Sequence, residues 1–149
     1  LMRETDLNEV LRDVLRLVRY ELNRHSIRLV ESFAEIPEVQ ADPNKLKQVF
    51  INLIMNATQA MPEGGTLTIA TAALDGNEVE ARIGDSGPGI PPEIRERIFE
   101  PFFSTKKEGE GTGLGLYICR NIIAEHEGRL LLESEPGRGA TFRIVLPLG

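Results

Sequence analysis

The chain has 149 residues, of which 41% are hydrophobic, 27% are charged and 5% are aromatic. This composition is typical of a globular domain and excludes collagen-like, disordered and disulfide-dense chains. The chain has 17 Lys and Arg and 23 Asp and Glu, so its formal net charge is −6. Because nucleic-acid binding needs a basic surface, we expect no nucleic-acid partner. One Cys and two His cannot form a structural zinc site, which needs four such ligands.

No apolar run approaches the roughly 18 residues of a membrane-spanning helix, and no signal peptide is recognisable. The chain begins at Leu1 rather than at Met, and we interpret it as part of a longer protein. We predict one domain over residues 1–149, with residues 1–6 as the end of a linker. We expect a cytoplasmic domain without direct membrane contact, whether or not the parent protein is anchored in a membrane.

The first half of the chain predicts two long helices separated by a strand. Asp6 and Glu9 form a capping box before apolar residues at helical spacing, which predicts a helix over 7–24. The alternation in residues 27–33 indicates a strand. Asp42-Pro43 then provides an N-cap and a proline at the first helical position, which predicts a second helix up to about Met61.

The second half alternates strands with helices, and its turns are marked by glycine and proline. The predicted elements are strands over 66–72 and 78–84, a short helix over 91–98, a long helix over 114–126, and strands over 130–133 and 141–146. This order predicts an α+β fold, a two-layer α/β sandwich. We expect a mixed sheet of about five strands, covered on one face by three main helices.

A polar stripe runs beside the apolar side of the second predicted helix. It contains Asn52 and Asn56, which lie one turn apart. Asn is a mediocre helix former, so two of them in mid-helix suggest a function. Amide oxygens can bind Mg²⁺, which proteins usually share with the phosphates of a substrate. A solvated helix face is the alternative interpretation.

Asp85 follows a predicted strand directly and begins the segment Asp-Ser-Gly-Pro-Gly-Ile, which ends at Ile90. Gly87 and Gly89 permit a close approach of a ligand to the backbone. The carboxylate of Asp85 could accept a hydrogen bond from an amino group. On this segment alone, a turn in which Asp85 bonds its own backbone is the simpler explanation.

Residues 109–116 contain four glycines and lead into the last predicted helix. The free N–H groups and the positive dipole end of that helix suit a phosphate group. Lys106 and Lys107 lie just upstream. The segment matches neither a Walker A loop nor a dinucleotide-binding fingerprint. A flexible surface loop is the alternative.

In this order the segments resemble the catalytic ATP-binding domain of bacterial sensor histidine kinases. That family shares the Bergerat ATP-binding fold with DNA gyrase B, the Hsp90 chaperones and the MutL proteins. The resemblance covers about residues 6–147. Its motifs are the asparagine box 48–57, the first glycine box 85–90, the phenylalanine box 98–106, the second glycine box 111–116 and the terminal glycine motif 137–142.

The resemblance implies a role for each motif. Asn56 would bind Mg²⁺, Asn52 would support the metal or phosphate site, and Asp85 would bind the adenine amino group of ATP. The segment from about Phe99 to Thr112 would form a lid, from which Lys106 would reach the γ-phosphate. The implied catalytic residues are Asn52, Asn56 and Lys106. The implied nucleotide-binding residues are Asn56, Asp85, Gly87, Gly89, Ile90, Phe99, Thr105, Lys106, Gly111, Thr112, Gly113, Leu114, Gly115, Leu116 and Thr141.

Asn52 distinguishes a kinase from an ATPase within this resemblance. The hydrolysing relatives carry Glu at this position to activate water, whereas an amide cannot accept a proton at neutral pH. The resemblance therefore implies phosphoryl transfer to a histidine on a helical-hairpin dimerisation domain that would precede residue 1. A response-regulator receiver domain would be the next partner. A nucleotide-binding regulatory module without transferase activity, or an ATPase of the same superfamily, is the alternative.

Several residues outside these motifs have simpler interpretations. His25 and His126 end predicted helices, where a histidine is favourable for structural reasons. Cys119 lies on the apolar side of its helix and is predicted to be buried and inert. We expect Phe102 or Phe103 to dock on the helical hairpin. Without that hairpin the domain is expected to be monomeric.

Overall fold

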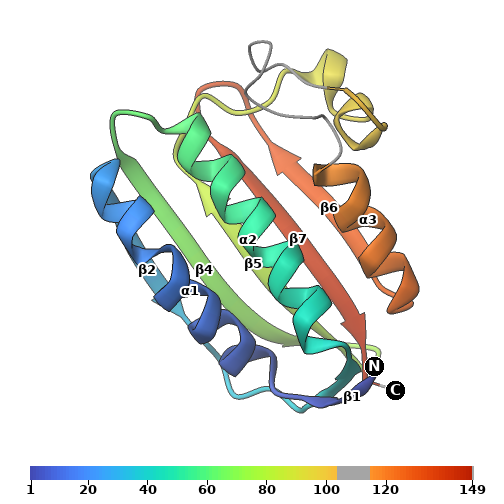
Figure 1. Cartoon of the computed structure of the whole chain (residues 1–149). Helices are drawn as coiled ribbons and strands as arrows, with labels where there is room; N and C mark the ends of the chain where they lie inside the picture. The colour runs from blue at the N-terminus through green and yellow to red at the C-terminus, as the bar shows by residue number, and fades with distance from the viewer. Residues whose placement is uncertain (104–114, 149) are drawn as a thin grey trace.

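The computed structural model describes residues 1–103 and 115–148. In these residues its two layers are a five-stranded sheet and three α-helices, and the helices cover one face of the sheet (Figure 1). The strand order is β2-β4-β5-β7-β6. The β2–β4 pair is parallel and the other neighbours are antiparallel, so the sheet is mixed as predicted.

The elements lie close to their predicted positions. The helices are α1 (Leu7–Arg24), α2 (Pro43–Ala60) and α3 (Gly115–Glu125), with 3₁₀ turns at Pro92–Ile94 and Arg97–Phe99. The main sheet contains β2 (Ile27–Ser32), β4 (Gly65–Leu74), β5 (Glu78–Asp85), β6 (Arg129–Ser134) and β7 (Ala140–Pro147). A second, two-stranded sheet pairs β1 (Arg3–Thr5) with β3 (Val39–Ala41).

Both predicted helix caps are present. The Asp6 carboxylate accepts hydrogen bonds from the backbone N–H groups of Asn8 and Glu9 at the start of α1. Asp42 does the same for Asn44 and Lys45 at the start of α2. Such side chains satisfy N–H groups that have no partner inside the helix, so these caps determine where the two helices begin.

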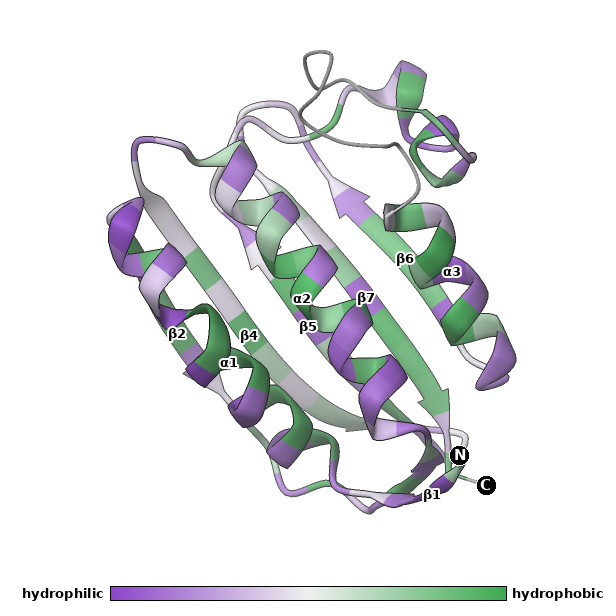
Figure 2. Cartoon of the chain, viewed as in Figure 1, coloured by the Kyte–Doolittle hydropathy of each residue, from purple (hydrophilic) through white to green (hydrophobic). Residues whose placement is uncertain are grey.

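The core lies between the helices and the covered face of the sheet. Residues at alternate positions of each strand point into it, including Leu67, Ile69, Ile83 and Ile144, which are all buried. The hydrophobic residues of α1 and α2 face the same layer, and polar residues follow their outer sides (Figure 2). The intervening strand residues point to the face that carries no helix.

The structure differs from the predicted elements in two places. The short helix expected over 91–98 is instead two 3₁₀ turns. The strands β1 and β3 were not expected, because three residues are too few to show a periodic pattern. Strand β1 lies within the segment predicted as a linker, and Thr5 is buried there with its Oγ1 bonded to the carbonyls of Arg3 and Ala41.

Candidate functional site

The polar stripe of α2 faces the beginning of α3. The Asn52 Nδ2 donates a hydrogen bond to the Cys119 Sγ at 3.7 Å, and this thiol donates to the Val49 carbonyl at 3.8 Å. A Cβ atom built at Gly115 would lie 3.7 Å from the Asn52 Oδ1. The N-terminal end of α3, with its free N–H groups, therefore lies beside the Asn52 amide.

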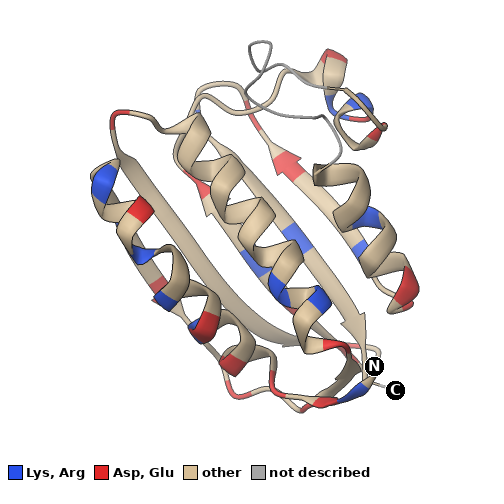
Figure 3. Ribbon diagram, viewed as in Figure 1, with Lys and Arg blue, Asp and Glu red and all other residues tan. Residues whose placement is uncertain are grey.

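Asn56 lies one turn further along α2 and is half-buried. The charged residues of α2 are Lys45 and Lys47, both in its N-terminal half, so the stretch around Asn52 and Asn56 is neutral (Figure 3). Among the described residues, no cluster of three His, Cys, Asp or Glu could hold a metal ion. An amide oxygen together with phosphate oxygens of a ligand is a donor set that fits Mg²⁺.

Asp85 ends β5 and, by strand alternation from Ile83, points to the covered side of the sheet. Its Oδ1 accepts hydrogen bonds from the backbone N–H groups of Gly87 at 2.9 Å and Ala140 at 3.3 Å. Burial raises the pKa of Asp85 above the ordinary value of 3.8. Within residues 1–103 and 115–148, no group donates a hydrogen bond to Oδ2, so this oxygen is left to accept one from a ligand.

The loop after Asp85 lies against the C-terminal end of α2. A Cβ at Gly87 would lie 3.0 Å from the Ala60 carbonyl oxygen, and Ala60 is one turn beyond Asn56. The structure thus brings the first glycine box to the same end of α2 as the asparagine box. Gly89 has a φ of 81°, and a Cβ there would lie 2.6 Å from the Glu135 carbonyl oxygen.

The described part of the phenylalanine box has two packed rings and one exposed ring. Phe99 meets Phe142 edge-on, with 6.3 Å between ring centroids, and the Arg120 guanidinium lies 5.4 Å from the centroid of Phe99. The Arg97 guanidinium lies 4.8 Å from the centroid of Phe103. Phe102 is 75% exposed and has a φ of 66°, so its ring is presented to solvent.

Comparisons with known proteins agree with this arrangement. Residues 41–149 match the family described as "Histidine kinase-, DNA gyrase B-, and HSP90-like ATPase". The chain belongs to this family. Its fold superposes with the catalytic domain of the histidine kinase ThkA at a TM-score of 0.89 and 37% identity, over 99% of this chain and 96% of that one. The histidine kinase type of catalytic domain predicted from the sequence is therefore confirmed.

Other similar proteins are longer kinases. The chain is 44% identical over 144 residues to Sporulation kinase C of Bacillus subtilis and 39% identical over 148 residues to sensor histidine kinase ZraS of Escherichia coli. The matches cover 95% and 99% of this chain but only 33% and 31% of those proteins. It also matches ShkA in complex with AMPPNP (TM-score 0.89, 31% identity) and ThkA in complex with the response regulator protein TrrA (TM-score 0.85, 35% identity). Each match covers 99% of this chain, but 31% of ShkA and 42% of that ThkA chain.

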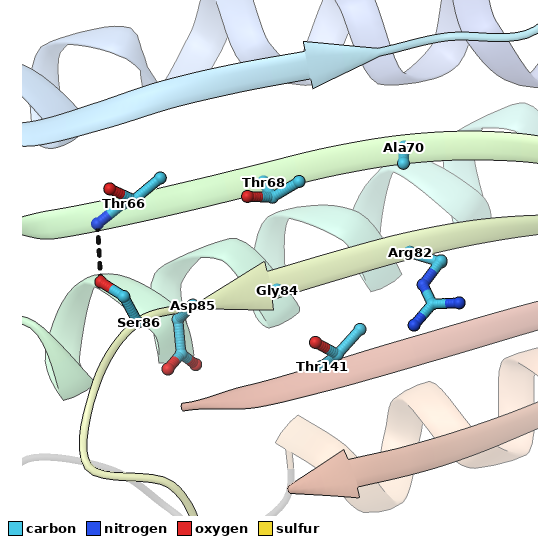
Figure 4. A pocket seen from close by; sticks show the side chains of 8 residues that line it. All are labelled: Thr66, Thr68, Ala70, Arg82, Gly84, Asp85, Ser86 and Thr141. Atoms are coloured by element: carbon cyan, nitrogen blue, oxygen red, sulfur yellow. Dashed lines mark hydrogen bonds between the residues drawn. The ribbon is translucent and has the colours of Figure 1, made fainter. Parts of the chain in front are cut away.

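One predicted site residue of the kinase domain, Thr141, lies on β7. Thr141 pairs with Gly84 across β5 and β7, and both point to the face without helices. They line a hollow at the end of β5, together with Thr66, Thr68, Ala70, Arg82, Asp85 and Ser86 (Figure 4). Thr141 and Asp85 thus border the same hollow, and the predicted nucleotide contact of Thr141 remains a prediction.

Of the remaining predicted nucleotide-binding residues, some lie in the part of the chain that the structure describes and others lie outside it. Gly115 and Leu116 begin α3, and Leu116 packs against the core. The backbone N–H of Ile90 is bonded within the protein. Thr105, Lys106, Gly111, Thr112, Gly113 and Leu114 lie outside the described residues, so their predicted roles remain predictions.

The titratable residues that we predicted to be structural have structural partners. Asp42 donates its backbone N–H to the His126 Nε2 at 3.0 Å, so the Nδ1 carries the proton and donates to the Ile122 carbonyl at 2.7 Å. The His25 Nδ1 lies 3.2 Å from the Pro62 carbonyl. Burial raises the pKa of Cys119 to about 11, which keeps its thiol protonated and unreactive at neutral pH.

None of the helices in the described ranges is both long enough and apolar enough to cross a membrane.

Proposed function

We propose that the domain binds Mg²⁺–ATP beside α2 and donates the γ-phosphoryl group to a histidine on a separate helical-hairpin domain, in two-component signal transduction. The observation that carries this proposal is the position of Asp85 at the same end of α2 as Asn56. The Asp85 carboxylate suits the amino group of adenine, and the Asn56 amide oxygen suits a hard cation. The similarity to ShkA, whose structure contains AMPPNP, supports a nucleotide ligand.

Each group has a separate role in this proposal. The Oδ2 of Asp85, to which no described residue donates, accepts a hydrogen bond from the adenine amino group. The Asn56 amide oxygen is a ligand to Mg²⁺, which neutralises and orients the phosphates when bound. Lys106 reaches the γ-phosphate and the glycines 111–115 close over it. These last roles follow from the resemblance alone.

Transfer is favoured over hydrolysis by the residue at position 52. Its amide donates a hydrogen bond to Cys119 and cannot accept a proton from water at neutral pH. Transfer of a phosphoryl group to an imidazole nitrogen relies mainly on alignment and charge neutralisation. A site without a base at this position therefore suits a kinase better than an ATPase.

The partners follow from the proposed transfer. The first is the histidine-bearing hairpin of the parent protein, and the second is the receiver domain of a response regulator. The complex of ThkA with the response regulator TrrA supports the second partner. We place the domain in the cytoplasm, as a monomer when it is separated from the hairpin.

The decisive test uses γ-labelled ATP with Mg²⁺, the domain alone, and the domain with the separately supplied hairpin. We expect acid-labile label on the hairpin and little free phosphate. Asn56→Ala should reduce transfer by at least about 100-fold, because it removes a metal ligand worth roughly 3 kcal/mol. Gln48→Ala is the matched control, since Gln48 is an exposed amide on α2 one turn before Asn52, and this variant should transfer as the wild type does.

Two results would contradict the proposal. Rapid phosphate release by the domain alone, abolished by Asn56→Ala, would indicate an ATPase. Nucleotide binding without transfer or hydrolysis would indicate a regulatory module.

We also propose that the exposed ring of Phe102 docks on the hairpin. Phe102→Ala should lower transfer in trans by about 10-fold, as expected for an anchor residue worth roughly 1–2 kcal/mol, with unchanged ATP affinity. Tyr20→Ala is the control, because Tyr20 is a similarly exposed ring on α1, 74% accessible. Equal transfer by wild type and Phe102→Ala over a range of hairpin concentrations would contradict this role.

A further inference from the structure

The turn between β6 and β7 supports the loop that begins at Asp85, although the two are far apart in sequence. Two backbone groups of this region reach the loop. The Gly137 N–H donates to the Pro88 carbonyl at 2.8 Å, and the Ala140 N–H donates to the Asp85 Oδ1 at 3.3 Å. A third connection, at the far end of the loop, is made by a side chain.

Ser134, the last residue of β6, makes that third connection. Its Oγ accepts a hydrogen bond from the Ile90 N–H at 2.7 Å and donates one to the Gly139 carbonyl at 3.1 Å. Ser134 is only 9% exposed, so water has little access to replace either bond. A serine hydroxyl has one proton to donate, and Ser134 uses it on the turn while accepting from the loop.

The loop and the turn are also in direct contact. A Cβ at Gly89 would lie 2.6 Å from the Glu135 carbonyl oxygen and 3.1 Å from the Ser134 Oγ. Since this contact leaves no space between the two backbones, movement of Ser134 would be transmitted to residues 85–90. The loop contains two glycines, which make it costly to order without such support.

We propose that Ser134 is a positioning residue for nucleotide binding. Its hydroxyl fixes the Ile90 end of the loop while Ala140 fixes the Asp85 end, and together they hold the carboxylate in place for the adenine base. This inference rests on the proposed function, because it assumes that Asp85 receives the base. Ser134 itself touches no part of the proposed ligand.

Loss of the hydroxyl would affect binding through the loop. Ser134→Ala leaves the Ile90 N–H and the Gly139 carbonyl without their partner, so the loop would spend part of its time away from the binding arrangement. Apparent affinity falls by the fraction of molecules in the competent state. Loss of the hydrogen bond to the Ile90 N–H should therefore raise the dissociation constant roughly 3- to 10-fold.

The test compares Ser134→Ala, Ser134→Thr and Thr5→Val by calorimetric titration with ATP and with ADP, alongside thermal unfolding. Thr5 is the matched control because it is a buried hydroxyl, 6% exposed, bonded to two carbonyls in the β1–β3 sheet. We expect Ser134→Ala to weaken ATP and ADP equally, since the base is common to both. Thr5→Val should lower the melting temperature without changing either affinity, and Ser134→Thr should restore binding to within about twofold of the wild type.

In transfer assays, Ser134→Ala should raise the KM for ATP and leave kcat unchanged. Wild-type affinity in Ser134→Ala would overturn the inference while leaving the proposed function intact. Equal losses of nucleotide affinity in Ser134→Ala and Thr5→Val would also overturn the inference, because they would indicate a general effect of lower domain stability. A wild-type domain that binds neither nucleotide would overturn both this inference and the proposed function.

Discussion

Gly139→Ala is expected to destabilise the domain by roughly 2–5 kcal/mol and to abolish nucleotide binding. Gly139 has a φ of 84°, which costs an L-residue roughly 1–2 kcal/mol. A Cβ atom there would also overlap the carbonyl oxygen of Asp85. Because the obstructing atom belongs to the backbone, it cannot rotate away as a side chain could, and overpacking adds roughly 1–3 kcal/mol.

Gly137→Ala is a closely matched control in the same turn. Gly137 has a φ of 79°, but no atom lies within 4 Å of the Cβ that alanine would add. Its cost should be only the conformational one of roughly 1–2 kcal/mol. Urea unfolding of the two variants measures the difference directly. Equal stabilities would show that the loop at Asp85 can move away from the turn, which would contradict the close support described above.

Local signals in the sequence were sufficient for most of the fold. Asp6 and Asp42 each precede an amphipathic segment and cap the helix that follows. Alternation identified the strands because one face of the sheet is buried and the other is not. The same alternation, read from the core residue Phe142, places Thr141 on the opposite face of β7.

The contacts that shape the candidate site could not be read from the sequence. The second donor to Asp85 is the backbone N–H of Ala140, and a backbone donor requires no particular residue type. Ser134 has no distinguishing local pattern, since its partners come from another loop and from the next turn. Such contacts depend on which strands become neighbours, and β5 and β7 are distant in the chain.

The two interpretations of Asp85 that the sequence left open are compatible in the structure. The Oδ1 accepts from the Gly87 N–H two residues later, as in the turn that was the simpler explanation. Since the bonds from Gly87 and Ala140 both use Oδ1, Oδ2 has no donor within the described part of the chain and can accept from a ligand. The turn therefore orients the carboxylate and does not compete with the proposed contact to adenine.

Asp85→Asn is expected to weaken ATP binding by about 30- to 100-fold, equivalent to roughly 2–3 kcal/mol. The two backbone N–H groups require an acceptor, so the asparagine oxygen should take the place of Oδ1. The asparagine Nδ2 would then face the adenine amino group, and two donors cannot bond each other. Titration with ATP measures the loss. Asp75→Asn, at an exposed carboxylate in the β4–β5 turn, should bind as the wild type does.

The same variant should be at least as stable as the wild type at pH 7. Burial raises the pKa of Asp85 in the folded domain, so the folded state holds the proton more tightly than the unfolded chain, and the ionised form costs stability. The contribution of Asp85 to stability is present in full below its pKa in the unfolded chain, and it is lost as the pH rises through its pKa in the folded domain. The advantage of Asp85→Asn should therefore disappear in acid. As the pH is lowered, protonation of Asp85 should weaken ATP binding by the wild type. Because the pKa of Asp85 is raised, this loss should begin at a higher pH than for an ordinary aspartate. A lower melting temperature for Asp85→Asn at pH 7 would instead show that the charge serves the fold rather than the ligand.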